Sequence, residues 1–323
     1  MLPNFRYLKP HSLAQAIEHA AVPGAVLHGG GTDLLGLLRD GVTQAETVVS
    51  LSGLAELRGL REERGRLRIG ALTTVGELAA NPVVQRTVPG LAQAAAAVAS
   101  PQLRNQGTVG GNLCQKPRCW YYRGDFHCLR KGGDTCFAAK GENRYYHCIF
   151  GGESCFYVHP SDLAPMFVAL GALARLAGPA GSRVVPVEKL FVLPEEDFTR
   201  ETVLERGELV TEVVVPLPPA GTATSYRKVR TRGAWDFALA GVALAVSWDG
   251  QLVREARVVL AGVAPIPWRA AGADNALRGV RLTPAEAARA AEASVVGARP
   301  LECNAYKIDL VRNLVRESLL ALR

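Results

Sequence analysis

Residues 28–35 read His28-Gly29-Gly30-Gly31-Thr32-Asp33-Leu34-Leu35, and this segment decides how the N-terminal part of the chain is interpreted. The apolar run Ala25–Leu27 before it predicts a short strand, and the leucines after it have helical spacing. Glycines let the backbone approach a ligand, and N–H groups at a helix start can point at a phosphate. The segment has neither the G-x-G-x-x-G spacing of a nicotinamide site nor a Walker A ending. Taken alone, it fits a plain tight turn and a phosphate-binding loop equally well.

Strand and helix signals alternate around this segment. Ser12 is placed to cap a helix over residues 13–20, and Thr47–Leu51 predicts a second strand. This βαβ order is typical of a small parallel sheet. Further along, Thr74–Glu77 has the pattern of a capping box, and residues 89–100 predict a buried helix.

A second glycine loop follows at residues 100–112, which read Ser-Pro-Gln-Leu-Arg-Asn-Gln-Gly-Thr-Val-Gly-Gly-Asn. Hydroxyl and amide donors accompany its glycines, as in the first loop. One such loop is weak evidence for a ligand. Two loops about 80 residues apart in sequence can grip a pyrophosphate from both sides, as a dinucleotide with a split site requires.

The C-terminal third has its own pattern. Prolines at 216–219 indicate a domain boundary. Beyond them, apolar residues 242–247 and 252–263 predict two strands joined by a hairpin at Asp249-Gly250. Residues 308–322 predict a final amphipathic helix. The whole pattern is typical of an α+β protein.

Composition narrows the class of protein. The chain has 323 residues, 48% hydrophobic and 21% charged, which favours a soluble globular protein over a disordered one. The net charge of +7 is spread without a long basic run, so a protein partner is favoured over nucleic acid. We find neither a membrane span nor a secretory signal and expect a cytoplasmic protein. A partner subunit carrying an export signal would place it in the periplasm instead.

Cysteine is concentrated in one segment. Six of the seven cysteines fall between residues 114 and 155, within a stretch that has little periodicity and reads as an irregular insertion. A large chain with its cysteines gathered in this way favours a metal or cluster site over a disulfide scaffold. No C-x-x-C pair occurs, so neither a zinc ribbon nor a ferredoxin loop fits well. Zinc remains a rival to iron because thiolates suit both metals.

The two glycine loops and four later segments resemble the flavin subunit of the xanthine dehydrogenase and carbon monoxide dehydrogenase family. The later segments are 159–165 (HPSDLAP), 226–232 (YRKVRTR), 262–269 (GVAPIPWR) and 304–307 (NAYK). The resemblance covers nearly the whole chain. It implies a PCMH-type FAD-binding domain with two subdomains, at 1–55 and 56–217, the second carrying a cysteine-rich insertion at 114–158. It also implies a C-terminal flavoprotein domain at 218–323, with a small antiparallel sheet and helices.

The same resemblance implies an FAD site. Its residues would be Leu27, His28, Gly29, Gly30, Gly31, Thr32, Asp33, Leu34, Thr108, Gly110, Gly111, Asn112, Asp162 and Lys228. Asp162 would lie near the flavin or its ribityl chain, and Lys228 would approach the isoalloxazine. Each has a simpler alternative: Asp162 can cap its own helix, and Lys228 can be a solvated strand residue.

The insertion resembles that of the branch containing 4-hydroxybenzoyl-CoA reductase and the iron–sulfur aldehyde oxidoreductases, which implies one additional [4Fe–4S] cluster. The implied ligands are Cys119, Cys128, Cys136 and Cys155, and Cys148 is the main rival to Cys155. The two remaining cysteines, Cys114 and Cys303, are expected to be ordinary buried thiols.

The sequence offers no nucleophile elbow, no H-E-x-x-H motif and no acid–base pair at a telling spacing, which suits an electron-transfer subunit. The resemblance implies partners: a large molybdenum-cofactor subunit that oxidises an aldehyde or N-heteroaromatic ring, and a small [2Fe–2S] subunit. It implies a heterotrimer, or a dimer of heterotrimers, in which this chain relays electrons through FAD to an external acceptor. In a benzoyl-CoA-type enzyme the electrons would run in reverse.

Two rival functions stay open at this stage. One is a non-catalytic metal-binding interaction module, which would bind no flavin. The other is a vanillyl-alcohol-type FAD oxidase, for which His28 would be the candidate covalent attachment site.

Overall fold

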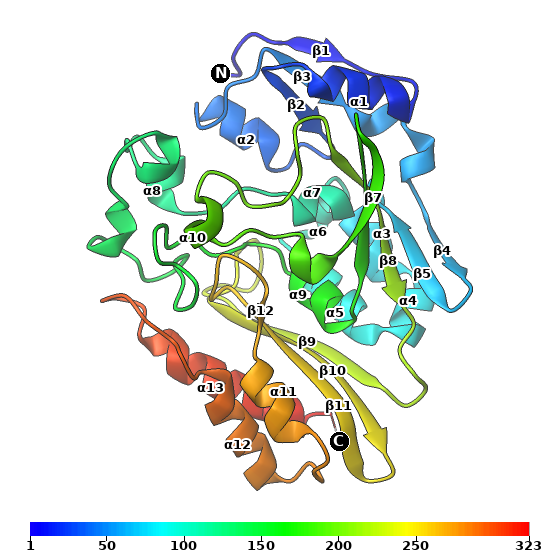
Figure 1. Ribbon diagram of the computed structural model, residues 1–323, viewed down its shortest axis with the longest axis vertical. Coiled ribbons are helices and arrows are strands. Elements are labelled where there is room, and N and C mark those ends of the chain that lie inside the picture. Colours follow the sequence, from blue (N-terminus) through cyan, green and yellow to red (C-terminus); the bar gives the residue numbers. More distant parts are fainter. Residues whose placement is uncertain (323) are drawn as a thin grey trace.

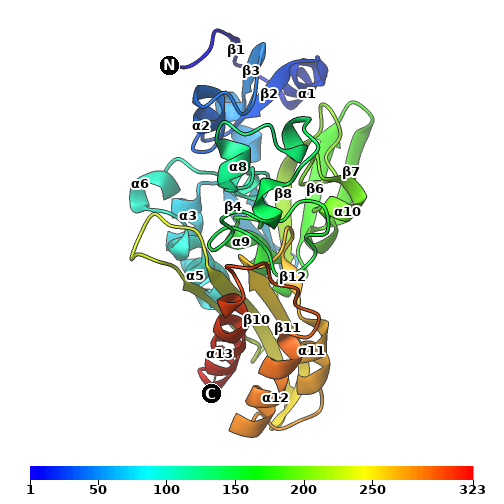
Figure 2. The same ribbon diagram turned by 90° about the vertical axis from the view of Figure 1, so that its left-hand side faces the viewer.

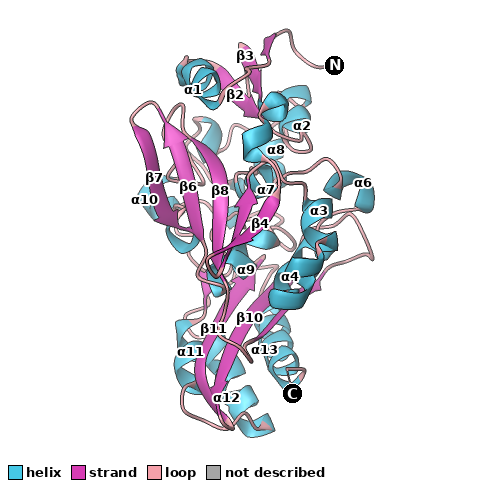
Figure 3. Cartoon of the chain, turned by 90° about the vertical axis from the view of Figure 1, so that its right-hand side faces the viewer, coloured by secondary structure: helices cyan, strands magenta, loops and turns pink. Residues whose placement is uncertain are grey.

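Three β-sheets follow one another along the long axis of the molecule (Figure 1). The structure is a computed structural model, and it describes residues 1–322. The sheets contain three, five and four strands, and helices cover them (Figure 3). Among the helices of residues 1–322, none has the length and apolar character needed to cross a bilayer.

The first sheet is parallel, with strand order β1-β3-β2, and this confirms the βαβ prediction. Ser12 caps helix α1 by accepting a hydrogen bond from the Gln15 N–H. Helix α1 connects β1 to β2, which both pair with β3, and α2 connects β2 to its parallel neighbour β3. The elements of this unit are β1 (Arg6–Leu8), α1 (Leu13–Ala21), β2 (Ala25–His28), α2 (Leu34–Arg39) and β3 (Thr47–Ser50).

The second sheet is antiparallel, with strand order β4-β5-β8-β6-β7. Its strands are β4 (Leu60–Glu63), β5 (Arg66–Gly70), β6 (Leu173–Gly178), β7 (Gly181–Pro186) and β8 (Leu209–Pro216). The predicted capping box of Thr74 and Glu77 opens helix α3. The helices in this part are α3 (Val75–Ala80), α4 (Pro82–Thr87), α5 (Pro89–Ala97), α6 (Pro101–Arg104), α7 (Val109–Leu113) and α9 (Leu163–Ala169).

The third sheet is antiparallel, with strand order β12-β11-β10-β9. The predicted hairpin joins β10 to β11, and Gly250 adopts the positive φ of 58° that the turn needs. The elements are β9 (Ala223–Val229), β10 (Ala240–Asp249), β11 (Leu252–Ala261), β12 (Trp268–Arg269), α11 (Ala271–Leu277), α12 (Pro284–Ser294) and α13 (Tyr306–Leu320).

The two faces of this third sheet belong to different cores. One face packs on the helices α11, α12 and α13, through residues such as Val242, Leu244 and Val258. The other face joins the central core around α5 and α9, through Ala243 and Val259. Alternation along a strand sends successive side chains to opposite faces, so one apolar strand serves both cores.

The cysteine-rich segment lies beside the axis defined by the sheets, on the left in Figure 1, below α2 and above α13 (Figures 1 and 2). It is mostly irregular, as predicted, with three short helical turns at α8 (Trp120–Arg123), Leu129–Lys131 and Phe137–Ala139. The short helix α10 (Pro194–Asp197) and the chain after it cover the insertion from the side of the second sheet.

Candidate functional site

The two glycine loops meet in space. A Cβ on Gly30 would lie 1.8 Å from the carbonyl oxygen of Gln106, so only glycine permits this approach. A Cβ on Gly29 would lie 3.0 Å from the hydroxyl oxygen of Thr108. Gly31 has a φ of 73°, in the left-handed region that glycine adopts without strain. The loops predicted to face each other are therefore in direct contact.

Thr108 sets the conformation of the second loop. Its hydroxyl accepts a hydrogen bond from the Gly111 N–H at 3.1 Å and so caps α7. The Gly110 N–H donates to the carbonyl of Ala71 at 2.8 Å, which fixes the loop to the end of β5. The side-chain oxygen of Asn112 accepts a hydrogen bond from the Ser161 hydroxyl.

Two cavities lie along these loops, with volumes of about 400 and 380 Å³. They share lining residues from both loops, so they are adjacent, and together they are called the groove below. The shared residues are Thr32, Asp33, Thr108, Gly111 and Gln115. The larger cavity is also lined by Leu27, Gly29, Gly30, Gly31, Leu34 and Gly110, and the smaller one by Asn112 and Asp162. Of the residues predicted to hold FAD, only His28 and Lys228 line neither cavity.

His28 packs behind the first glycine loop. A Cβ on Gly31 would come within 2.7 Å of its Nε2 atom, and the ring of Tyr7 meets it edge-on at 6.3 Å. Burial lowers the pKa of His28, and its Nδ1 atom has no hydrogen-bond partner among the described residues. The ring is therefore a neutral packing group against the loop.

Asp162 and Lys228 form a buried ion pair at 2.7 Å, with side chains 5% and 3% exposed. The Tyr226 hydroxyl donates to the other oxygen of Asp162 at 2.6 Å. Both simpler alternatives from the sequence are wrong: Asp162 makes no capping hydrogen bond to α9, and Lys228 is not solvated. Lys228 stands behind Asp162, and only the carboxylate side of the pair lines the cavity.

Asp33 links the first glycine loop to the start of the insertion. Its carboxylate pairs with Arg118 at 2.9 Å and Arg123 at 2.8 Å, and it accepts the Lys116 N–H at 2.8 Å. Burial lowers the pKa of Arg118 to about 10, which leaves it charged at neutral pH. Asp33 therefore serves as an anchor for the insertion as well as a lining residue.

The sequence did not point to several residues that line the smaller cavity. Arg118 lies over the ring of Phe237 at 4.6 Å, and Trp235, which has a positive φ of 52°, stands at the same cavity. An aromatic residue in a loop carries no periodic signal. The only hint was the family-like segment 226–232 immediately before them.

Four cysteines of the insertion face a common region. Cys119, Cys128 and Cys155 are buried in one cluster with Tyr122, Leu37 and Tyr157. Burial raises the pKa of Cys119 to about 11, and the charges of Cys136 and Cys128 add to this shift. A hydrogen bond from Cys155 lowers the pKa of Cys136 to about 6. Cys119 is therefore within electrostatic range of Cys128 and Cys136, and Cys136 lies next to Cys155.

The remaining cysteines and the histidine beside them have different surroundings. Cys148 is buried, which raises its pKa to about 12, and its sulfur lies against Gly152, although Cys136 is also within range of it. Burial likewise raises the pKa of Cys114 to about 12. All seven cysteines are free thiols. His147 places Nε2 3.3 Å from the Cys119 sulfur.

The predicted cysteine ligands do not form a site for a single metal ion in this structure. Within residues 1–322, no three His, Cys, Asp or Glu side chains are close enough to hold one metal ion. A tetrahedral zinc site needs four sulfurs about 2.3 Å from one point.

Comparison with known proteins identifies the class. The family described as the FAD binding domain in molybdopterin dehydrogenase matches residues 3–218, and the CO dehydrogenase flavoprotein C-terminal domain matches residues 224–322. The chain is 37% identical to the aldehyde oxidoreductase FAD-binding subunit PaoB of Escherichia coli K12, over 84% of this chain and 86% of that one. It is 30% identical to the carbon monoxide dehydrogenase medium chain of Hydrogenophaga pseudoflava, over 93% and 89% of the two chains.

Solved structures agree with this class. A carbon monoxide dehydrogenase from Hydrogenophaga pseudoflava, lacking the Mo-pyranopterin moiety, superposes with a TM-score of 0.80, at 30% identity, covering 100% of this chain and 98% of that one. Quinoline 2-oxidoreductase from Pseudomonas putida 86 gives 0.77 at 25% identity, with 100% and 98% covered. The chain belongs to the FAD-binding medium subunits of the molybdenum hydroxylase family, and it is an oxidoreductase subunit. Membership of this family excludes both rival functions, the non-catalytic metal-binding module and the vanillyl-alcohol-type oxidase.

Proposed function

We propose that the groove between the two glycine loops holds FAD, with its diphosphate at the contact between them. The contact of Gly30 with the Gln106 carbonyl carries this proposal, because it brings N–H-rich turns from distant parts of the chain to one place. The larger cavity would take one end of the dinucleotide, and the smaller, with Asp162, would take the flavin end. When bound, FAD supplies the electron-transfer chemistry, and the chain positions it.

We propose the same division into domains that the sequence suggested, because it agrees with the proposed FAD site. Subdomains at 1–55 and 56–217 would enclose the cofactor, since the first glycine loop lies in one and the second loop in the other. The domain at 218–323 would close the flavin end through Trp235 and Phe237.

We propose that the chain works in an assembly with a large molybdenum-cofactor subunit and a small [2Fe–2S] subunit, passing electrons between them and an external acceptor. Its similarity to subunits of heteromeric enzymes supports this. The likeness to an aldehyde oxidoreductase subunit at 37% identity favours an aldehyde as the substrate of the assembly. A soluble assembly of this kind fits a cytoplasmic location, or the periplasm if a partner carries the export signal.

We propose in addition that the insertion holds a [4Fe–4S] cluster through Cys119, Cys128, Cys136 and Cys155. Two observations support it: three of the four thiols are buried in one cluster, and residues in contact with that cluster carry buried donors without hydrogen-bond partners. These donors are Tyr157 Oη and the Nε and Nη1 atoms of Arg130. Cluster sulfurs accept hydrogen bonds, so such donors fit beside one.

The flavin site is tested by changing Gly30 to Ala. The new methyl group has no room against the Gln106 carbonyl, so we expect the purified subunit to lose most of its FAD, measured by absorption near the flavin bands and by release of free FAD. The matched control is Gly233→Ala, because a Cβ at Gly233 meets nothing within 4 Å. Full FAD content in a folded Gly30→Ala protein would contradict the proposal.

A further inference from the structure

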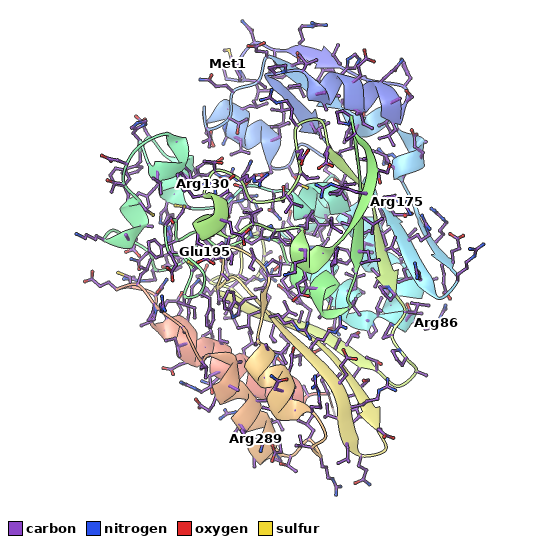
Figure 4. All side chains as sticks on the ribbon, viewed as in Figure 1. Met1, Arg86, Arg130, Arg175, Glu195 and Arg289 are labelled. Carbon is purple, nitrogen blue, oxygen red and sulfur yellow. The ribbon has the colours of Figure 1, made fainter. Side chains whose placement is uncertain are left out.

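Arg130 has the least exposed side chain among the cations of the insertion that form salt bridges. It follows Cys128 by two residues, in the turn Leu129–Lys131, on the side of the molecule that carries the insertion (Figure 4). Its side chain is 3% exposed and pairs with the carboxylate of Glu201, which is 4% exposed. The guanidinium lies 5.2 Å from the ring centre of Tyr122 and 4.9 Å from that of Tyr157. Aromatic faces and one carboxylate thus fix its position.

Some N–H donors of the Arg130 guanidinium have no hydrogen-bond partner within residues 1–322. Nη2 contacts Glu201 and donates to the carbonyl of Thr199 at 3.3 Å. Nε and Nη1 are buried, and within residues 1–322 neither has a hydrogen-bond partner. A guanidinium has five N–H donors in a fixed plane and cannot lose its charge. Unpaired buried donors are costly, so their presence points to an acceptor that binds there.

The two aromatic rings that face the guanidinium, Tyr122 and Tyr157, are buried in one cluster with three of the proposed ligands, Cys119, Cys128 and Cys155. No other cation of the insertion combines this burial, this proximity and free donors.

We propose that Arg130 tunes the iron–sulfur cluster: its Nε–H and Nη1–H groups donate to the sulfurs and raise the reduction potential of the cluster. The inference rests on the proposed function, since it requires the cluster to be present. A positive charge and hydrogen bonds to sulfur stabilise the reduced form, which carries one more negative charge. One electron enters on reduction, and no bond or proton is exchanged.

Glu201 carries the negative charge that is paired with Arg130, so its substitution tests the same effect in the opposite direction. Its carboxylate is shared between Arg130 and Lys116. Removing its charge leaves the positive charge of Arg130 less compensated. The pair therefore predicts opposite shifts of the potential for the two substitutions.

The test is a redox titration of the purified assembly with all its subunits, reduced by dithionite and followed by EPR at liquid-helium temperatures. We expect Arg130→Gln to lower the reduced-to-oxidised ratio of the [4Fe–4S] cluster about tenfold at a fixed potential, a shift of about 59 mV for one electron. Glu201→Gln should move the potential upward, and Arg130→Lys should shift it downward by less than Arg130→Gln. Arg144→Gln, at an exposed arginine of the insertion, is the control and should leave it unchanged.

The outcomes separate the two proposals. Wild-type protein that contains zinc, or that lacks iron and acid-labile sulfide, would refute the cluster itself. A wild-type cluster with an unchanged potential in Arg130→Gln would overturn the role of Arg130 alone. If Arg130→Gln does not retain iron, the other two variants decide: no shift in Arg130→Lys and Glu201→Gln would also overturn it.

Discussion

At the scale of single residues, the groove depends on a glycine that has no Cβ atom and on a buried ion pair. Gly30 works because it has no Cβ, whereas Asp162 can stay buried at the groove because Lys228 and Tyr226 hold it. A carboxylate in this position needs a counter-charge, since removing one partner of a buried pair leaves an uncompensated charge.

Lys228 offers a prediction at this scale. Replacing it by Met leaves Asp162 buried without its cation, and we expect the free energy of unfolding to fall by about 3–5 kcal/mol. Urea denaturation of wild type and variant measures this difference. The double variant Asp162→Asn with Lys228→Met should recover part of the loss. The exposed Lys189→Met serves as the control, and an equal loss there would contradict the explanation.

At the scale of elements, the start of helix α13 is fastened to the insertion by a buried amine. Lys307 Nζ donates to the carbonyls of His147 at 3.1 Å and Gly262 at 2.8 Å. The amide of Asn304 donates to the carbonyls of His147 and Cys148. The last helix therefore holds the end of the insertion in place, although about 150 residues separate them in the chain.

The stability that buried Lys307 contributes depends on pH. Burial lowers the pKa of Lys307 from 10.5 to about 7, so between these values the unfolded chain binds more protons than the folded one. Stability contributed by this site therefore rises with pH above about 7, by up to about 1.4 kcal/mol per pH unit. Relative to Lys307→Met, we expect the unfolding free energy of the wild type to rise by up to about 1.4 kcal/mol per pH unit between pH 7 and 10. A difference that does not vary between pH 7 and 10 would contradict the assignment.

At the scale of the whole molecule, the third sheet belongs to two cores at once. Residues on one face of β10 pack with the central helices, and those on the other face pack with the C-terminal helices. Because the strands are shared, neither core can lose its packing without exposing the other.

This sharing predicts one cooperative transition. Leu163→Ala in the central core and Leu244→Ala in the C-terminal core should each lower the stability by about 2–5 kcal/mol and move the same thermal transition. Differential scanning calorimetry measures it. Two separate transitions, with each substitution moving only one of them, would refute the shared core.

The sequence by itself determined the parts that local chemistry controls. Ser12, Thr74 and Gly250 make their predicted caps and turn, because a cap or a positive φ depends on a few neighbouring residues. The glycine loops were visible for the same reason, and their motif spacing led to the correct family. The cysteine spacing marked an unusual segment but did not choose its ligands.

Only the tertiary structure decided which distant groups meet. Gly30 touches Gln106, Lys228 pairs with Asp162, and Arg130 is buried against Glu201, across separations of about 70 residues or more. No periodicity records such pairs, since they depend on how whole elements pack. Buried charges gain their stability from a partner's exact position, and the folded chain alone supplies that position.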